Sequence, residues 1–74
     1  MNAANGIRAR NTERMNEVQR LMESNAHLDE GEDYNRLEEL LSKLSMYFNV
    51  LTNEDRDYIQ ACRYAIDEKV DWSI

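Results

Sequence analysis

The chain has 74 residues, a formal net charge of −6 and a single cysteine. This length allows one small domain, and one cysteine excludes the disulfide framework that often stabilises domains of this size. Proline is absent and only two glycines occur, which favours helices. We therefore predict an all-α fold that gains further buried area by associating with itself or with a partner.

The N-terminal residues 1–10 are small, polar and basic. We expect them to form a flexible basic N-terminal arm, followed by a single helical domain over residues 11–74. The first helix is predicted at residues 12–24, because Asn11 or Thr12 offers the side-chain oxygen of an N-cap.

The apolar stripe of this first helix is narrow and rich in methionine, with Met15, Val18 and Met22 on one face. Flexible methionine side chains suit an adaptable binding surface as well as a core. The core interpretation is favoured, and a partner-binding helix is the alternative. Asn25 is suited to end the helix in the left-handed conformation.

A longer apolar seam follows, with spacings that alternate between three and four residues, and it predicts a second helix at residues 32–50. Asp29 and Glu32 have the spacing of a capping box at its start. Met46 falls on the opposite, polar side of this helix. The seam consists of Tyr34, Leu37, Leu41, Leu44, Phe48 and Leu51.

A third helix is predicted at residues 53–71, with Thr52 as its N-cap and Asp55 completing a capping box. The short break before it predicts an antiparallel helical hairpin with the second helix, so the fold is a small three-helix domain. The third helix carries two apolar stripes, which indicates contact with two neighbours. The first stripe is Ile59, Cys62, Ile66 and Val70, and the second is Tyr58, Ala65 and Trp72.

Large apolar residues in the last segment of the sequence indicate an interface, because exposed tryptophan and isoleucine are an unusual use of residues that are enriched at interfaces. We expect a two-fold homodimer that buries Tyr58, Trp72 and Met46. The candidate interaction residues, including the methionines of the first helix, are Met15, Met22, Met46, Tyr58, Trp72 and Ile74.

Reactive groups do not form a recognisable catalytic or metal-binding pattern. Cys62 lacks a nearby base or an electropositive setting, and His27 has no second histidine or cysteine at ligand spacing. Gly-rich phosphate loops and nucleophile-elbow motifs are absent. We therefore predict a protein that is not an enzyme and that carries no cofactor and no metal.

Charge is distributed unevenly, with arginines near the N-terminus and carboxylates in the rest of the chain. An acidic body argues against binding of nucleic acid or an anionic membrane. The sequence contains no apolar run that could span a bilayer and begins without the apolar stretch of a secretory signal, so we expect a cytoplasmic protein.

Two short segments carry a resemblance to a known group of proteins. The segment from Leu51 to Ile59 and the segment from Cys62 to Ala65 resemble short uncharacterised helical proteins encoded by T4-like phages of cyanobacteria. The resemblance covers roughly the last two-fifths of the chain. It implies a small accessory protein that acts in the infected cell, where it binds a host or viral protein.

The sequence therefore favours a non-enzymatic protein–protein interaction module that self-associates and modulates a host or viral protein. The alternative is a nucleic-acid-linked regulator, which would use its N-terminal arginine arm or present its acidic helices as a DNA mimic.

Overall fold

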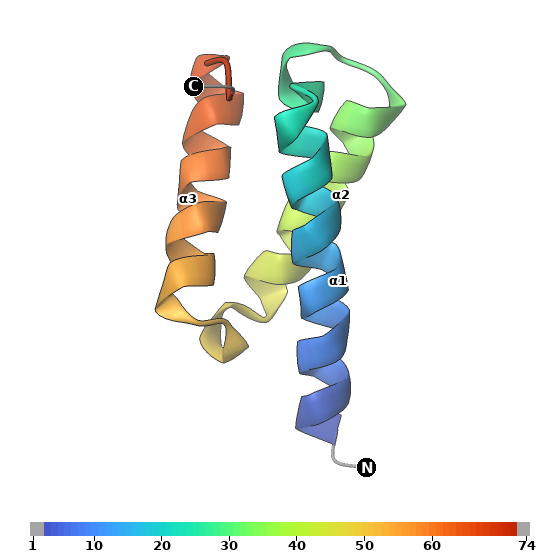
Figure 1. The fold of residues 1–74 in the computed structure, drawn as a ribbon, viewed down its shortest axis with the longest axis vertical. Helices are drawn as coiled ribbons and strands as arrows, with labels where there is room; N and C mark the ends of the chain where they lie inside the picture. Colours follow the sequence, from blue (N-terminus) through green and yellow to red (C-terminus); the bar gives the residue numbers. More distant parts are fainter. Residues whose placement is uncertain (1–2, 73–74) are drawn as a thin grey trace.

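The computed structural model describes the backbone of residues 3–72 and the side chains of residues 6–72. Within residues 3–72, three α-helices run up, down and up around one core, and each successive pair is antiparallel (Figure 1). The predicted all-α three-helix fold is therefore confirmed. The elements are α1 (Ala3–Glu23), the 3₁₀ turn η1 (Ala26–Leu28), α2 (Glu32–Met46), the 3₁₀ turn η2 (Phe48–Val50) and α3 (Asn53–Glu68).

Helix α1 begins at Ala3, so the predicted start near residue 12 is wrong and the segment predicted as an arm is helical from residue 3. Neither proposed cap residue caps the helix. The Asn11 side chain is buried and accepts a hydrogen bond from Arg14 Nη1 at 2.8 Å, and Thr12 Oγ1 donates to the carbonyl of Arg8 at 3.0 Å. Both side chains thus bond within the helix, and the alanines and arginines before them are good helix formers.

The connection from α1 to α2 agrees with the sequence prediction at Asn25 and differs from it at Asp29. Asn25 adopts the left-handed conformation, with φ 58° and ψ 35°, and ends α1 as expected. The capping box predicted for Asp29 and Glu32 is wrong, because Gly31 is the N-cap residue of α2 and no side chain caps it. Asp29 instead follows η1, where its N–H donates to the carbonyl of Ala26 at 3.3 Å.

Helix α2 ends at Met46, four residues before the predicted end, and the chain continues into η2. Arg56 holds this corner, since its Nε donates to the carbonyl of Phe48 at 2.9 Å and its Nη2 to that of Asn49 at 3.1 Å. The guanidinium also lies over the Phe48 ring, 5.2 Å from the centroid. These bonds satisfy carbonyls that a longer helix would have paired internally.

Helix α3 starts as predicted, with the backbone N–H of Asp55 donating to Thr52 Oγ1 at 3.1 Å. Its predicted end at residue 71 is wrong. The helix ends at Glu68 because Lys69 is left-handed, with φ 54°, and the N–H of Val70 then donates back to the carbonyl of Ala65. The last described residues therefore form a tail that leaves the helix axis.

The core takes one apolar stripe from each α-helix, and α1 and α2 pack against each other (Figure 1). Tyr34, Phe48, Tyr58 and Trp72 pack around it as half-buried side chains. The buried cluster consists of Met15, Val18, Met22, Leu37, Leu40, Leu41, Leu44, Leu51, Ile59, Cys62, Ala65 and Ile66.

Among the described side chains, one ion pair joins α1 to α2 on the surface. Arg36 donates to both carboxylate oxygens of Glu17, from Nε at 2.8 Å and from Nη2 at 3.0 Å. The hydrogen bonds from Arg36 hold the pKa of Glu17 below its ordinary value. Both side chains are partly exposed, so this pair orients the two helices more than it stabilises the fold.

No helix in the described part of the chain combines the length and the apolar character needed to cross a membrane.

The cap at the start of α3 yields a stability prediction. Replacing Thr52 by Ala removes the acceptor for the Asp55 N–H and should lower the free energy of unfolding by about 1 kcal/mol, measured by urea denaturation. Thr12→Ala is the matched control, because the exposed Thr12 hydroxyl donates to the carbonyl of Arg8 within α1 and caps no helix. Equal losses in the two variants would contradict the capping role.

Candidate interaction surface

The methionines singled out from the sequence separate into two environments. Met15 and Met22 are 6% and 0% exposed and lie in the core, so their side chains are not presented on the surface. Met46 is 72% exposed at the end of α2. The structure therefore places the methionine stripe of α1 in the core, and it leaves Met46 accessible.

The two aromatic candidates come together within one chain. The rings of Tyr58 and Trp72 pack edge to face, with centroids 5.5 Å apart and an interplanar angle of 77°. Both side chains are half-buried against the core. Ile74, the remaining candidate, lies outside the described residues.

A pair of hydrogen bonds fastens the tail after α3 to the turn between α1 and α2, and we call it the tail clamp. Nε2 of His27 lies 2.5 Å from the carbonyl oxygen of Val70, and because a carbonyl only accepts, this nitrogen carries the proton. The backbone N–H of Trp72 donates to Asn25 Oδ1 at 3.0 Å. Since His27 is 1% exposed, the clamp is anchored in the interior.

The clamped tail forms one wall of an open apolar groove on the outer side of α3, and we call it the α3 groove. Its volume is about 390 Å³, and its surface is almost wholly apolar. Tyr64 is 64% exposed and Val70 is 43% exposed. The groove is lined by Ala61, Tyr64, Ala65, Val70, Asp71 and Trp72.

Sequence reasoning missed Tyr64 and misplaced Val70. The predicted stripe put Val70 on the core face of a continuous helix, but the left-handed turn at Lys69 carries it out of that register. Tyr64 belongs to neither stripe, and a large aromatic residue on an otherwise polar helix face was the available signal. Both residues line the same groove.

The only thiol of the chain is unsuited to nucleophilic chemistry. Cys62 is fully buried, and burial raises the pKa of its thiol from 9.0 to about 12. Burial, with smaller effects of Cys62 and Glu23, raises the pKa of the Tyr58 hydroxyl from 10.0 to about 12. Both groups therefore stay protonated near neutral pH, where a nucleophile would need the thiolate.

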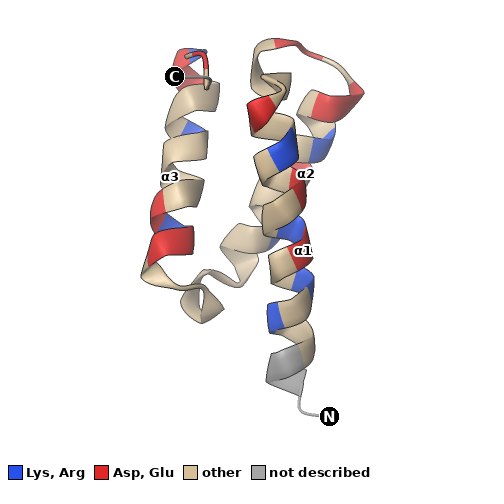
Figure 2. Cartoon of the chain, viewed as in Figure 1, with Lys and Arg blue, Asp and Glu red and all other residues tan. Residues whose placement is uncertain are grey.

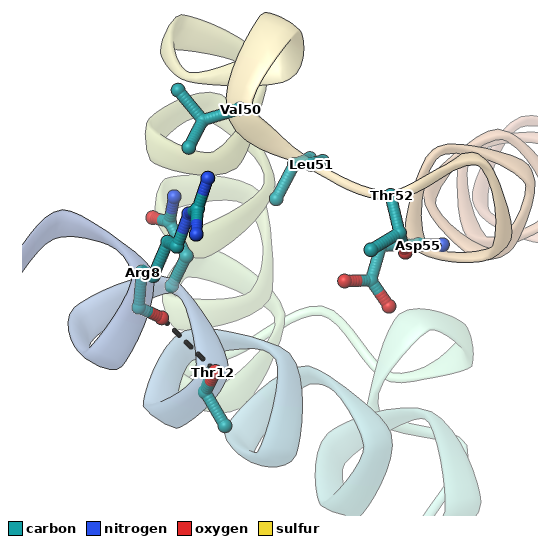
Figure 3. Close-up of a pocket in the computed structure, with 7 residues that line it drawn as sticks. Arg8, Thr12, Val50, Leu51, Thr52 and Asp55 are labelled. Carbon is teal, nitrogen blue, oxygen red and sulfur yellow. Dashed lines mark hydrogen bonds between the residues drawn. The ribbon is translucent and has the colours of Figure 1, made fainter. Parts of the chain in front are cut away.

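A second cleft of about 400 Å³ lies between α1 and the start of α3 (Figure 3). The Arg8 side chain extends toward Val50, and the Asp55 carboxylate lies across the cleft beside Thr52. No cysteine or histidine lines it. The amide nitrogen of buried Asn11 has no hydrogen-bond partner, an arrangement that costs about 1–3 kcal/mol.

The described helices differ in their balance of charge. Arginines alternate with glutamates along α1, whereas carboxylates outnumber arginines on α3 and gather near its two ends (Figure 2). Between residues 3 and 72, no three His, Cys, Asp or Glu side chains come together in a way that could hold a metal ion.

Comparison with models of known protein families, with curated protein sequences and with solved structures finds no match to this chain.

The tail clamp can be tested without disturbing the backbone of the turn. Asn25→Gly keeps a residue that tolerates the left-handed conformation and removes the acceptor for the Trp72 N–H. We expect the fluorescence of Trp72 to shift to longer wavelength while the helical circular dichroism is retained. Ser24→Ala is the control, because its hydroxyl bonds only to the carbonyl of Leu21. An unchanged emission spectrum in Asn25→Gly would argue against the clamp.

The buried thiol and phenol predict how stability depends on alkaline pH. The unfolded chain ionises Cys62 near pH 9.0 and Tyr58 near pH 10.0, whereas the folded chain retains both protons up to about pH 12. Raising the pH through this window therefore favours the unfolded state. The free energy of unfolding in urea should fall as the pH is raised above about 9. Cys62→Ala should show a shallower fall, and identical slopes would contradict the assignment.

Proposed function

We propose that this protein is a non-enzymatic protein-binding module whose docking surface is the α3 groove. The observation that carries the proposal is an apolar groove, open to solvent and walled by Tyr64 and Trp72, that remains outside after the three helices have buried their core. An exposed tyrosine and a half-buried tryptophan beside small residues are typical of surfaces that bind proteins.

Several features support binding rather than catalysis as the role. The imidazole of His27 is engaged with the tail, the thiol of Cys62 is buried, and neither lies on the α3 groove. The groove itself presents apolar side chains and one carboxylate, that of Asp71. Such a lining suits association with another apolar surface.

The homodimer predicted from the sequence stays a prediction. Tyr58 and Trp72 already pack on each other within one chain, which uses part of the aromatic surface that a dimer was expected to bury. We therefore propose a different protein as the occupant of the groove. The resemblance to short phage proteins makes a host or viral protein the expected partner.

Site-specific photocrosslinking tests this function. Benzoylphenylalanine in place of Tyr64 keeps an aromatic ring in the groove and should form a discrete adduct in lysate of the native host. The same residue in place of Met46 serves as a control on another exposed apolar position. Adding Ala61→Gln, which enlarges a groove residue without changing charge, should abolish the adduct at position 64. The proposal fails if both positions give the same adducts or if Ala61→Gln has no effect.

A further inference from the structure

We infer that the occupant of the α3 groove is a basic amphipathic helix of another protein, an inference that rests on the proposed function. The inference follows from the distribution of charge around α3. Its arginines form hydrogen bonds with the neighbouring elements on the inner side, and the spacing of its carboxylates places them on the outer side.

The arginines of α3 are committed to the inner side of the helix. Arg56 donates to the carbonyls of Phe48 and Asn49 in η2. Arg63 donates through Nη2 to the carbonyl of Leu41 at 3.3 Å and to Ser45 Oγ at 2.8 Å, both in α2. Their positive charges are therefore held against the neighbouring elements, away from the groove.

Carboxylates mark the two ends of the outer side. Asp57, Ala61, Tyr64 and Glu68 follow one another at spacings of four, three and four residues, which places them on one face of α3. The acids Asp57 and Glu68 are exposed, and Asp71 lines the groove itself. Lys69, at the helix end, is the remaining cation of this segment. The apolar groove is thus bracketed by negative charge along the helix axis.

The length of this surface fits a helix. Asp57 and Glu68 are eleven residues apart, which corresponds to about 16 Å along a helix axis. A partner helix of three or four turns can lay apolar side chains at positions i, i+3 and i+7 into the groove and place a lysine or arginine against each end. Charge complementarity of this kind raises the association rate and selects against wrong partners.

The same charges disfavour a second copy of this chain. A two-fold interface brings identical surfaces together, so Asp57, Glu68 and Asp71 of each copy would meet in or beside one apolar patch. Like charges near a desolvated contact oppose association, and the net charge of −6 adds to the repulsion.

Trp72 is the only tryptophan of the chain and stands in the groove wall, so its fluorescence reports occupancy directly. The probe is a synthetic 18-residue helix of leucine and lysine, without tryptophan, with leucines at alternating spacings of three and four. We expect saturable binding that weakens as salt is raised from about 0.05 M to about 0.5 M. A scrambled peptide of the same composition and a leucine–glutamate helix are the matched probes, and both should bind at least about tenfold more weakly.

Two double variants test the carboxylates. Asp57→Asn with Glu68→Gln should weaken binding of the leucine–lysine helix about fivefold. Glu13→Gln with Glu32→Gln changes the net charge equally at exposed positions on α1 and α2 and should leave binding nearly unchanged. Circular dichroism verifies that both variants remain helical.

The outcomes separate this inference from the proposed function. Equal binding of the leucine–glutamate or scrambled peptide, or equal losses in the two double variants, would overturn the basic helix as the occupant. The basic helix is also overturned as the occupant if the leucine–lysine helix does not bind while the photoadduct at position 64 still forms. If neither the peptide binds nor the photoadduct forms, the proposed function itself is overturned. A dimer in sedimentation equilibrium that Ala61→Gln dissociates would identify a second copy as the occupant.

Discussion

Shared burial of one apolar stripe from each of three helices is the constraint on which the rest of this structure depends. Val18 of α1, Leu41 of α2 and Cys62 of α3 are all fully buried and belong to one apolar cluster. Burying a side chain such as leucine contributes about 1.5–3 kcal/mol, and the loss of chain entropy offsets most of the sum. In a chain of 74 residues the core is small, and α3 contributes Ile59, Cys62, Ala65 and Ile66 to it.

Polar bonds at the edges of this core hold α3 in place and at the same time determine its outer surface. Arg56 donates to carbonyls of η2, Arg63 donates to a carbonyl within α2, and His27 and Asn25 fasten the tail. Because these arginines bond inward, the outer side of α3 carries mainly carboxylates and apolar side chains. The groove and its charge pattern are therefore consequences of how the fold is held together.

Much of the architecture was predictable because it depends on contacts between residues close in sequence. The three and four residue spacing of apolar positions located α2 and α3, and the hydroxyl of Thr52 and the left-handed tendency of Asn25 marked a start and a stop. The first and last residues of a helix were less predictable where a polar side chain could either cap the helix or form a hydrogen bond within it. Asn11 could have capped a helix from outside or bonded within it, and its burial beside Arg14 decided for the second.

The amino-acid sequence by itself determined an acidic three-helix domain with its apolar stripes turned inward and a single thiol among them. Only the tertiary structure decided which apolar side chains remain on the surface and form the α3 groove. The turn at Lys69 moved Val70 out of the core register, and bonds from residues more than forty positions earlier set the tail beside Tyr64. No periodic pattern encodes such a groove, because it arises from contacts between segments that are distant along the chain.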